Sequence, residues 1–399
     1  DRFHEVHEWI ASPDGERIAA PVLTEPDNFT VAVNDGRWDG EYEKAWHLAF
    51  TPDGRLTALV RIDDEWTVAV EGEAWENRWE FAWNPIFNRD GSVLAVQIKD
   101  NMEYGVAVNG HAWDQKFHSS RGLAVSGDGV HVAAVVQVEP LAEADIFGFM
   151  AGTWSVAVDG APWKQKFINV YGPVISADGE NVAAEVRLDI CEYTLAENSK
   201  TWDSRFGCVW EPVYRPNGRG LVAPVRSNGS WTIAENGSPI WGSRFMQLWN
   251  QRLSPDGEHI AAVVAPSFGE WTVVLDDRSW KTTFDDLVLP PVFSPDGRRV
   301  AAAVRANGSW GVAVDDKPWP ETYDMVWDPV FSSSGDRVIA KVERDGCFAF
   351  AIDGKVWSPW YEGLWEPVFS PDGDRWLIRA VENGTYLRQV VPFDSNCQG

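Results

Sequence analysis

The chain has 399 residues, 44% of them hydrophobic, and a formal net charge of −26 from 34 basic and 60 acidic side chains. Nucleic-acid binding requires a basic surface that neutralises phosphates, so this acidic balance argues against a nucleic-acid partner. No apolar run approaches the ~18 residues of a membrane-spanning helix, so direct membrane insertion is not expected.

A turn that closes on glycine recurs through the whole chain, at intervals of 37 to 40 residues and one interval of 50. The motif is most complete at Trp365–Gly373, which reads Trp-Glu-Pro-Val-Phe-Ser-Pro-Asp-Gly. Repeats of this length are typical of β-propellers and related arrays. The ten turn glycines are Gly15, Gly54, Gly91, Gly129, Gly179, Gly218, Gly257, Gly297, Gly335 and Gly373.

Each repeat divides into four short segments separated by turn signals. In one well-preserved repeat the first segment is Val292–Ser294, followed by Pro-Asp-Gly, a tight turn in which glycine supplies the positive φ. The second is the apolar run Arg299–Val304, and Asn307-Gly308 then predicts a hairpin turn. The third segment, Trp310–Val314, alternates with period two, and the fourth runs from a tryptophan to an aromatic residue four positions later. Four antiparallel strands in about 40 residues make one β-propeller blade.

Aromatic residues occupy fixed positions of the repeat. The third segment opens with an aromatic residue, and others stand sixteen, twelve and eight residues before the turn glycine. Each such ring buries on the order of 150–250 Å², so we predict that most of them wedge between neighbouring blades. The tryptophans sixteen residues before the glycine are Trp38, Trp75, Trp113, Trp163, Trp202, Trp241, Trp319 and Trp357; those eight before it are Trp46, Trp83, Trp210, Trp249, Trp327 and Trp365.

The two ends of the chain predict how the fold closes. The chain begins with a fourth segment, in which Phe3 stands at the aromatic position, and it ends after a third segment, Val390–Phe393. We therefore expect the N-terminal strand to complete the last blade, which leaves no open sheet edge. The prediction is an all-β fold in which residues 1–399 form a single β-propeller of ten four-stranded blades, with two five-bladed propellers as the alternative.

The interval of 50 residues contains an insertion at residues 137–153, between the second and third strands of the fourth blade. It is unusually apolar for a loop, because it carries Phe147, Phe149 and Met150 in addition to Leu141 and Ile146. Such a segment either folds onto its own blade or contacts a partner, and the sequence leaves both interpretations open.

Signatures of catalysis are missing from the sequence. There is no phosphate-binding GxxxxGK[ST] loop, no GxSxG elbow and no HExxH zinc motif. His4, His7 and His47 lie near the start of the chain and could in principle bind a metal, but a polar strand end explains them as well. The Asp-Gly turns lack the alternating oxygen ligands of calcium loops. We therefore expect no enzyme activity, no metal and no cofactor.

The cysteines give no further chemistry. Cys191, Cys208, Cys347 and Cys397 form no CxxC pair and no haem-attachment pattern. A chain of this length with four scattered cysteines has no disulfide framework, which favours a reducing compartment.

Polar residues recur seven positions before the turn glycine, where the inner strand of each blade begins. They include Glu211, Asp328 and Glu366, next to the tryptophans that stand eight before the glycine, and also Glu8, His47, Asn84 and Asn250. In a propeller this end of the inner strand shares a face with the loop between the second and third strands, so the insertion should lie on the same face and the Asp-Gly turns on the other. The candidate partner-binding residues are Phe147, Phe149, Met150, Trp46, Trp83, Trp210, Trp249, Trp327, Trp365, Glu211, Asp328 and Glu366.

Two families share features with this repeat. The Ser-Pro-Asp-Gly segments at residues 12–20, 254–262 and 294–302 resemble the propeller repeats of TolB and WD-repeat-like proteins. The pattern at residues 66–75 and 154–163, Trp-x-Val-Ala-Val-(Asp/Glu)-Gly-x-x-Trp, is similar to the tryptophan-rich subunit of the transmembrane redox complex (Tmc) of sulfate-reducing bacteria. That resemblance implies a soluble subunit on the cytoplasmic side, beside haem- and iron–sulfur-containing subunits. It assigns no redox role to any residue, because the ligand motifs of those neighbours are missing here.

These observations favour a non-catalytic scaffold in a membrane-associated electron-transfer complex. The alternative is a carbohydrate-binding or glycoside-processing propeller, because tryptophans that can stack on sugars stand beside Glu211, Asp328 and Glu366, and glycosidases work with paired carboxylates. A periplasmic protein of the TolB kind is a third possibility, which changes the expected location from cytoplasmic to periplasmic.

Overall fold

The computed structural model describes residues 3–218, 220–370 and 372–393, which form 44 strands and one short helix. The strands form ten antiparallel sheets of the propeller-blade type, numbered here sheet 1 to sheet 10 along the chain. The all-β, ten-bladed propeller class predicted from the repeat is confirmed. None of the described helices is long and apolar enough to cross a bilayer.

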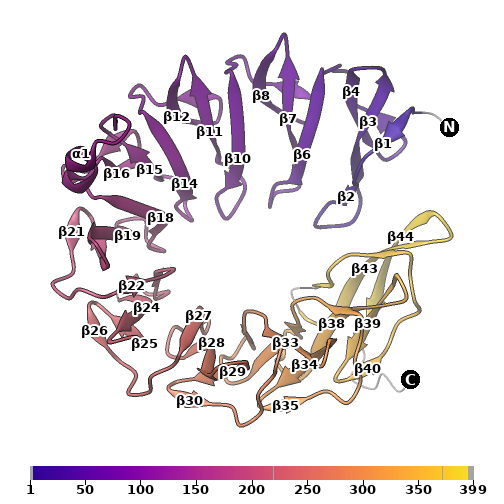
Figure 1. Ribbon diagram of the computed structural model, residues 1–399. Coiled ribbons are helices and arrows are strands. Elements are labelled where there is room, and N and C mark those ends of the chain that lie inside the picture. The colour runs from indigo at the N-terminus through magenta and orange to yellow at the C-terminus, as the bar shows by residue number, and fades with distance from the viewer. Residues whose placement is uncertain (1–2, 219, 371, 394–399) are drawn as a thin grey trace. The chain divides into compact units, whose positions relative to one another are not determined.

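The first compact unit, unit 1, comprises Asp1–Phe206 and contains sheets 1 to 5, which follow one another side by side (Figure 1). Sheet 1 contains β1 (Glu5–Val6), β2 (Ile10–Ala11), β3 (Ile18–Glu25), β4 (Asn28–Val33) and β5 (Gly36–Arg37); sheet 2 contains β6 (Lys44–Phe50), β7 (Leu56–Ile62), β8 (Glu65–Val70) and β9 (Glu73–Ala74). Sheet 3 contains β10 (Phe81–Phe87), β11 (Leu94–Asp100), β12 (Glu103–Val108) and β13 (His111–Ala112); sheet 4 contains β14 (Ser119–Val125), β15 (Val132–Gln137), β16 (Trp154–Val158) and β17 (Ala161–Pro162), with helix α1 (Ile146–Ala151) in its insertion. Sheet 5 contains β18 (Asn169–Ile175), β19 (Val182–Asp189), β20 (Glu192–Glu197) and β21 (Lys200–Thr201).

The second compact unit, unit 2, comprises Gly207–Gly399 and contains sheets 6 to 10. Sheet 6 contains β22 (Cys208–Val209), β23 (Val213–Tyr214), β24 (Leu221–Ser227), β25 (Ser230–Glu235) and β26 (Ser238–Pro239); sheet 7 contains β27 (Gln247–Leu253), β28 (Ile260–Ser267), β29 (Glu270–Leu275) and β30 (Arg278–Ser279). Sheet 8 contains β31 (Leu287–Val288), β32 (Val292–Phe293), β33 (Val300–Ala306), β34 (Ser309–Val314) and β35 (Lys317–Pro318); sheet 9 contains β36 (Met325–Val326), β37 (Val330–Phe331), β38 (Val338–Arg344), β39 (Cys347–Ile352) and β40 (Lys355–Val356). Sheet 10 contains β41 (Gly363–Leu364), β42 (Val368–Phe369), β43 (Arg375–Glu382) and β44 (Thr385–Pro392).

In sheets 1 to 9 the fourth strand of the blade lies earlier than expected. In sheet 2 it is β9, two residues that end just before Trp75, and the segment from this tryptophan to the next aromatic residue makes a single bridge, between Trp79 and Trp66. The bridge recurs in the following repeats, as between Phe117 and Tyr104. In the described part of sheet 10 the inner, second and third strands are present and a fourth strand is not. Its completion by the N-terminal segment, which would join the two units, stays a prediction, as does the closure of all ten blades into one ring.

The Asp-Gly turns connect the inner strand of a blade to its second strand. At the turn that contains Gly297, which has a φ of +72°, the Ser294 hydroxyl donates a hydrogen bond of 2.6 Å to Asp296 Oδ1, and Ser294 Oγ accepts from the backbone N–H of Arg299. The hydrogen bond from Ser294 holds the pKa of Asp296 below its usual value. The same arrangement recurs at Asp14, Asp128, Asp178, Asp256 and Asp372. Turn formation thus uses these carboxylates, as the sequence predicts.

The hydrophobic core is divided into layers between neighbouring sheets. Between sheets 1 and 2, Val31 of one sheet and Leu56 of the other pack around the rings of Trp38 and Tyr42, all of them buried. Trp75 and Trp79 have the same place between sheets 2 and 3, and Trp163 and Phe167 between sheets 4 and 5. Trp241 and Phe245 have the same place between sheets 6 and 7 of unit 2, so the prediction that aromatic residues wedge between blades is confirmed within each unit.

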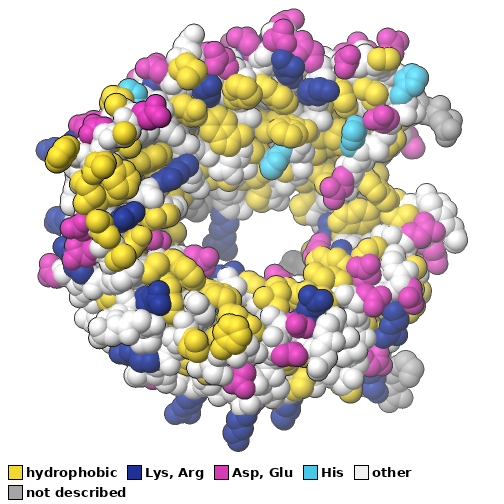
Figure 2. Space-filling view, in the orientation of Figure 1, with side chains coloured by type: hydrophobic (Ala, Val, Ile, Leu, Met, Phe, Trp, Pro, Cys, Tyr) yellow, Lys and Arg dark blue, Asp and Glu magenta, His cyan; other side chains and the backbone are white. Residues whose placement is uncertain are grey.

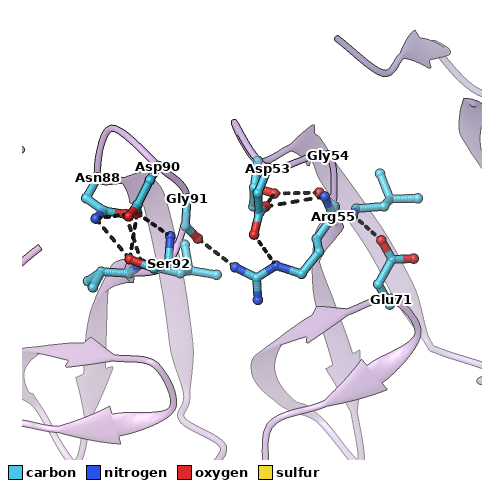
Figure 3. A network of polar contacts seen from close by, with 12 residues as sticks. Asp53, Gly54, Arg55, Glu71, Asn88, Asp90, Gly91 and Ser92 are labelled. Carbon is cyan, nitrogen blue, oxygen red and sulfur yellow. Dashed lines mark hydrogen bonds and ion pairs between the residues drawn. The ribbon is translucent and has the colours of Figure 1, made fainter. Parts of the chain in front are cut away.

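Arginines near the Asp-Gly turns link successive sheets. Arg55 ion-pairs with Asp53 in its own turn and donates from Nη2 to the carbonyl oxygen of Gly91, in the turn of the next sheet, at 2.6 Å (Figure 3). Arg17 makes the same link from sheet 1 to the Gly54 carbonyl, and both of its terminal nitrogens contact Glu71 of sheet 2 at 2.7 and 2.6 Å. Paired hydrogen bonds between a guanidinium and a carboxylate are among the stronger polar contacts in proteins.

Removal of the Arg17 link should weaken unit 1 measurably. In Arg17→Met the aliphatic stem remains while both contacts to Glu71 are lost, so we expect the free energy of unfolding to fall by about 1–3 kcal/mol. The measurement is urea unfolding followed by far-UV circular dichroism. Arg89 is an exposed arginine of the same unit for which the structure describes no ion pair, and Arg89→Met should change stability by less than about 0.5 kcal/mol. Equal losses in the two variants would contradict a specific link between the sheets.

Candidate functional site

Strand register separates the two ends of every sheet. In sheet 3, Phe81 at the start of the inner strand pairs with Lys99, next to the turn between Asp100 and Glu103. Phe87 at the other end of the inner strand pairs with Leu94, across the Asp-Gly turn. The starts of the inner strands and the turns between second and third strands therefore lie together, as predicted. We refer to this end of the sheets in each unit as the Trp-rich face.

Exposed apolar side chains are concentrated on the Trp-rich face. Phe147 is 90% exposed, and Phe268, in the turn between β28 and β29, is 93% exposed. Figure 2 shows hydrophobic side chains gathered over α1 and the neighbouring sheets of unit 1. Val130, 65% exposed, is an apolar residue of an Asp-Gly turn at the opposite end. Further large apolar residues exposed on the Trp-rich face are Trp46, Phe81, Met102, Ile146 and Ile190 in unit 1 and Met246 in unit 2.

The six candidate tryptophans of this face pack against the first aromatic residue of the third strand in their own sheet. Trp210 lies 4.5 Å from Trp231 and Trp249 lies 4.6 Å from Trp271, measured between ring centroids. Trp83, Trp327 and Trp365 make corresponding edge contacts with Tyr104, Phe348 and Tyr386 and are half-buried. Trp46 also contacts such a residue, Trp66, yet it is 58% exposed. Of the six, Trp46 is thus the ring most available to a ligand.

Four of the seven polar residues that precede the turn glycine by seven positions have irregular backbone, and three of these four lie at β-bulges. His47, Asn84, Glu211 and Asn250 all have positive φ values, between +39° and +54°, and the pairing of β6, β10 and β27 with the second strand shifts register at this point. Asparagine and histidine adopt this backbone conformation more readily than most residues, whereas glutamate does so less often. Backbone geometry therefore accounts for part of the repeated polarity of these positions.

The three candidate carboxylates of unit 2 have different surroundings. Burial raises the pKa of Asp328, Arg252 opposes the shift, and the Glu366 carboxylate adds to it, so Asp328 and Glu366 are close enough to interact. Glu366 also lies 3.8 Å from Lys341 Nζ. Glu211 is engaged through its backbone, because its carbonyl accepts a hydrogen bond from the Gln251 side chain. The structure thus brings together two of the three carboxylates.

Lys341 belongs to this group and was not among the predicted site residues. Its Nζ lies 4.4 Å from the centre of the Trp327 ring and 5.3 Å from that of Phe348, and burial lowers its pKa. The sequence could have indicated this residue, because Lys341 interrupts the apolar run of β38 at a position that carries an aliphatic residue in several other repeats. Cation–π contacts of this kind contribute about 0.5–2 kcal/mol.

The insertion of sheet 4 forms helix α1, which Asp145 caps through a 2.8 Å hydrogen bond from the Gly148 N–H. The Phe149 ring packs beneath the guanidinium of Arg187 in sheet 5, and Met150 is half-buried. Phe147 points away from these contacts and is almost fully exposed. One side of the helix is therefore anchored to unit 1, and the other remains available for a partner.

A cavity of about 630 Å³ lies between sheets 1 and 2 at the Trp-rich face. Cavities of this size that are mostly apolar with a few polar groups are typical of small-molecule sites. His7 and His47 both line it, but the described residues include no group of three or more His, Cys, Asp or Glu that could hold a metal. The lining residues are His7, Glu8, Ile10, Pro21, Phe29, Lys44, Ala45, Trp46, His47, Leu48, Arg61 and Trp66.

A second, smaller cavity of about 390 Å³ lies at the same end of sheet 7, between the start of β27 and the turn that carries Phe268. Its walls include Met246, Trp249 and Trp271, and it has few polar groups. The cysteines take no part in either cavity. Cys191 and Cys347 are free thiols, Cys208 Sγ lies 3.8 Å from the Val209 carbonyl oxygen, and Cys397 lies outside the described residues.

Comparison with known proteins finds similarity among solved structures. No family model and no curated protein matches the chain. The crystal structure of a eukaryotic initiation factor is 15% identical, covers 81% of this chain and 90% of its own, and has a TM-score of 0.48. The propeller of Dos1 is 11% identical over 88% of this chain and 93% of its own, with a TM-score of 0.40. TolB from Acinetobacter baumannii is 18% identical over 60% of this chain and 64% of its own, with a TM-score of 0.33. TolB and another β-propeller are thus among the solved structures to which the chain is similar.

Proposed function

We propose that the chain is a non-catalytic scaffold subunit of a membrane-associated electron-transfer complex and binds its partner through the Trp-rich face. The observation that carries the proposal is the concentration of exposed apolar side chains on this face, among them Phe81 and Phe147 in unit 1 and Phe268 in unit 2. Contiguous exposed apolar residues mark interaction surfaces, and aromatic residues and methionine are enriched in such interfaces.

The identity of the partner rests on the resemblance to the tryptophan-rich Tmc subunit. It supports haem- or iron–sulfur-containing subunits as partners and a cytoplasmic location in which the chain is held at the membrane through them. A periplasmic location is the alternative. The proposal assigns no catalytic residue and no cofactor to this chain, so the redox chemistry would belong to the partners.

The interface can be tested by placing a charge on the Trp-rich face. In Phe147→Glu and Phe268→Glu, a carboxylate replaces an exposed ring, and we expect capture of the partner to fall at least about tenfold, because burying an unpaired charge in an interface costs 2 kcal/mol or more. The measurement is affinity purification of the tagged full-length protein from its native membranes, with haem spectra and mass spectrometry of what co-purifies. Val130→Glu, which changes an exposed residue of an Asp-Gly turn at the opposite end, is the matched control and should capture the partner normally.

The second candidate function is carbohydrate binding or glycoside processing. It is favoured by Asp328, a carboxyl group whose pKa is raised mainly by burial and also by the nearby Glu366, because glycosidases combine a protonated and an ionised carboxyl group. Purification of the chain as a free monomer, together with glycan binding or hydrolysis of aryl glycosides that Asp328→Asn abolishes, would replace the scaffold proposal with this one. Co-purification of haem or iron–sulfur subunits without any glycan binding would exclude it.

A further inference from the structure

The cavity between sheets 1 and 2 contains an unusual pair of cations. Lys44 at the start of β6 and Arg61 near the end of β7 are directly opposite each other in the antiparallel register, and both line the cavity. Like charges at directly opposite positions destabilise a sheet. The repulsion of such a pair therefore has to be offset by negative charge, from the protein or from a ligand.

Among the described residues, only one of the two cations has carboxylate partners. Arg61 contacts Asp64 at 2.5 Å, and its Nε lies 3.5 Å from Glu43. For Lys44 the described residues contain no carboxylate within 4 Å, and its Nζ lies 4.9 Å from the centre of the Phe29 ring. Lys44 is thus the cation that remains for a ligand.

The pair is peculiar to sheet 2. The ten described sheets all have a residue pair at this position of the register, and in three of them it is Phe81 with Lys99, Asn169 with Arg187, and Leu287 with Arg305. No other described pair at this position combines two cations. Repetition of the blade sequence alone therefore does not explain Lys44 opposite Arg61.

The same cavity offers flat apolar surfaces beside these charges. Trp46 lies 5.7 Å from Trp66 with the two planes inclined by 38°, and more than half of the Trp46 surface is open. Lys44 Nζ lies over the ring of Phe29, and the centroid of this ring is 5.7 Å from that of His7. Aromatic faces stack on planar rings and on the apolar faces of sugars, so the cavity combines a ring-binding wall with a cation.

From this geometry we infer that the cavity is a binding site for a small ring-bearing carboxylate. The carboxylate pairs with Lys44, and the ring lies against Trp46. Aromatic carboxylates and uronic acids share this chemistry. A uronic acid would also present hydroxyl groups, for which the exposed Glu8 carboxylate is an acceptor within the lining. The inference depends on the cavity alone and holds whether or not the Trp-rich face binds a redox partner.

Isothermal titration calorimetry of the full-length protein tests the site with three probes: 1-naphthoate, glucuronate and the neutral 1-naphthalenemethanol. We expect one of the two acids to bind and Lys44→Gln to weaken it at least about tenfold, the effect of losing one charge-assisted contact. Lys44→Gln should leave the weak binding of 1-naphthalenemethanol unchanged, whereas Trp46→Ala should weaken every probe that binds. Binding of 1-naphthoate alone identifies an aromatic acid as the ligand type, and binding of glucuronate alone identifies a uronic acid.

The matched controls come from the next sheet. Lys99 also lies over an aromatic ring, Phe81, and Trp83 is the repeat equivalent of Trp46, but neither residue lines this cavity. Lys99→Gln and Trp83→Ala should therefore bind the probes as the parent protein does. Far-UV circular dichroism confirms the fold of each variant. Equal losses in the Lys44 and Lys99 variants, or no binding of either acid at millimolar concentration, would overturn the inference.

Discussion

Replacement of Trp376 by alanine is expected to lower the free energy of unfolding by about 3–5 kcal/mol, the range measured for the removal of large buried rings. Trp376 in β43 is 1% exposed and is the largest fully buried side chain of the described residues. Its ring contacts Phe350, Trp357, Phe369 and Phe393, with centroid distances between 4.6 and 6.2 Å. Alanine would leave a cavity in the middle of this aromatic cluster, and far-UV circular dichroism during urea unfolding measures the loss.

Two further variants show how much of this loss in stability comes from packing of the ring, from its polar N–H group and from its burial. The Trp376 Nε1–H is buried and has no hydrogen-bond partner in the part of the chain that the structure describes. Trp376→Phe removes this group and retains an aromatic ring, so it should cost less than half as much as alanine. Trp46→Ala removes a mostly exposed tryptophan and should cost less than about 1 kcal/mol. If Trp376→Ala proved no more destabilising than Trp46→Ala, the aromatic cluster would not be the core of sheet 10.

A buried acid should make the stability of unit 1 depend on pH. Glu185 in β19 is 6% exposed, and burial raises its pKa to about 8 from a usual value of 4.5. The folded protein keeps the Glu185 proton between these values while the unfolded chain releases it. Stability therefore falls as pH rises, starting near pH 4.5 and ending near pH 8. The slope is about 1.4 kcal/mol per pH unit, and the total cost at pH 8 is on the order of 4 kcal/mol.

Glu185→Gln removes this titration, so we expect the difference in unfolding free energy between variant and parent to change steadily from pH 5 to pH 8 in favour of the variant. Glu185→Leu, which restores the aliphatic character of Leu59 and Val135 in the equivalent positions, should be more stable than the parent at pH 8. Glu180→Gln, at an exposed position of the preceding turn, is the control and should follow the pH profile of the parent. Identical profiles for the Glu185 variants and the parent would show that this carboxyl is not held protonated.

Trp376 departs from the repeat, whereas Glu185 lies at a position where other blades also carry polar residues, namely Gln97, Lys341 and Arg379. Most blades have valine, leucine or isoleucine where Trp376 stands, and several have an aliphatic residue where Glu185 stands. When most blades have the same type of residue at a position, a blade with a different residue there has a structural or functional need of its own. The Lys44–Arg61 pair in sheet 2 is an exception of the same kind as Trp376.

The proposed partner surface and the proposed ligand cavity lie on the same face of unit 1, and Trp46 contributes to both. The variants separate the two roles. Phe147→Glu should weaken partner capture and leave the binding of the acids unchanged, because Phe147 does not line the cavity. Lys44→Gln should weaken the binding of the acids and leave partner capture unchanged. A partner that covers the cavity would instead weaken acid binding when it is present, and calorimetry on the purified complex would detect this competition.

The sequence alone determined the all-β class, the ten blades, the Asp-Gly turns and the face to which the tryptophans belong. These features follow from interactions between residues near in sequence, because each blade is built from consecutive strands joined by short turns. The position of the fourth strand was mistaken, since the tryptophan that seemed to open it follows it and packs between sheets, as Trp75 does. Spacing alone cannot distinguish a strand residue from one in an extended segment that makes a single bridge.

Only the tertiary structure decided which of these repeated residues differ from one another. Six tryptophans are equivalent in the sequence, but Trp46 is exposed beside a cavity, while the other five are half-buried. Glu211, Asp328 and Glu366 are equivalent as well, yet the Glu366 carboxylate lies 3.8 Å from Lys341 Nζ and adds to the raised pKa of the buried Asp328. Exposure, charge pairing and cavities depend on strand register and on the side chains of the neighbouring sheet, and residues that meet in this way are often far apart in the chain.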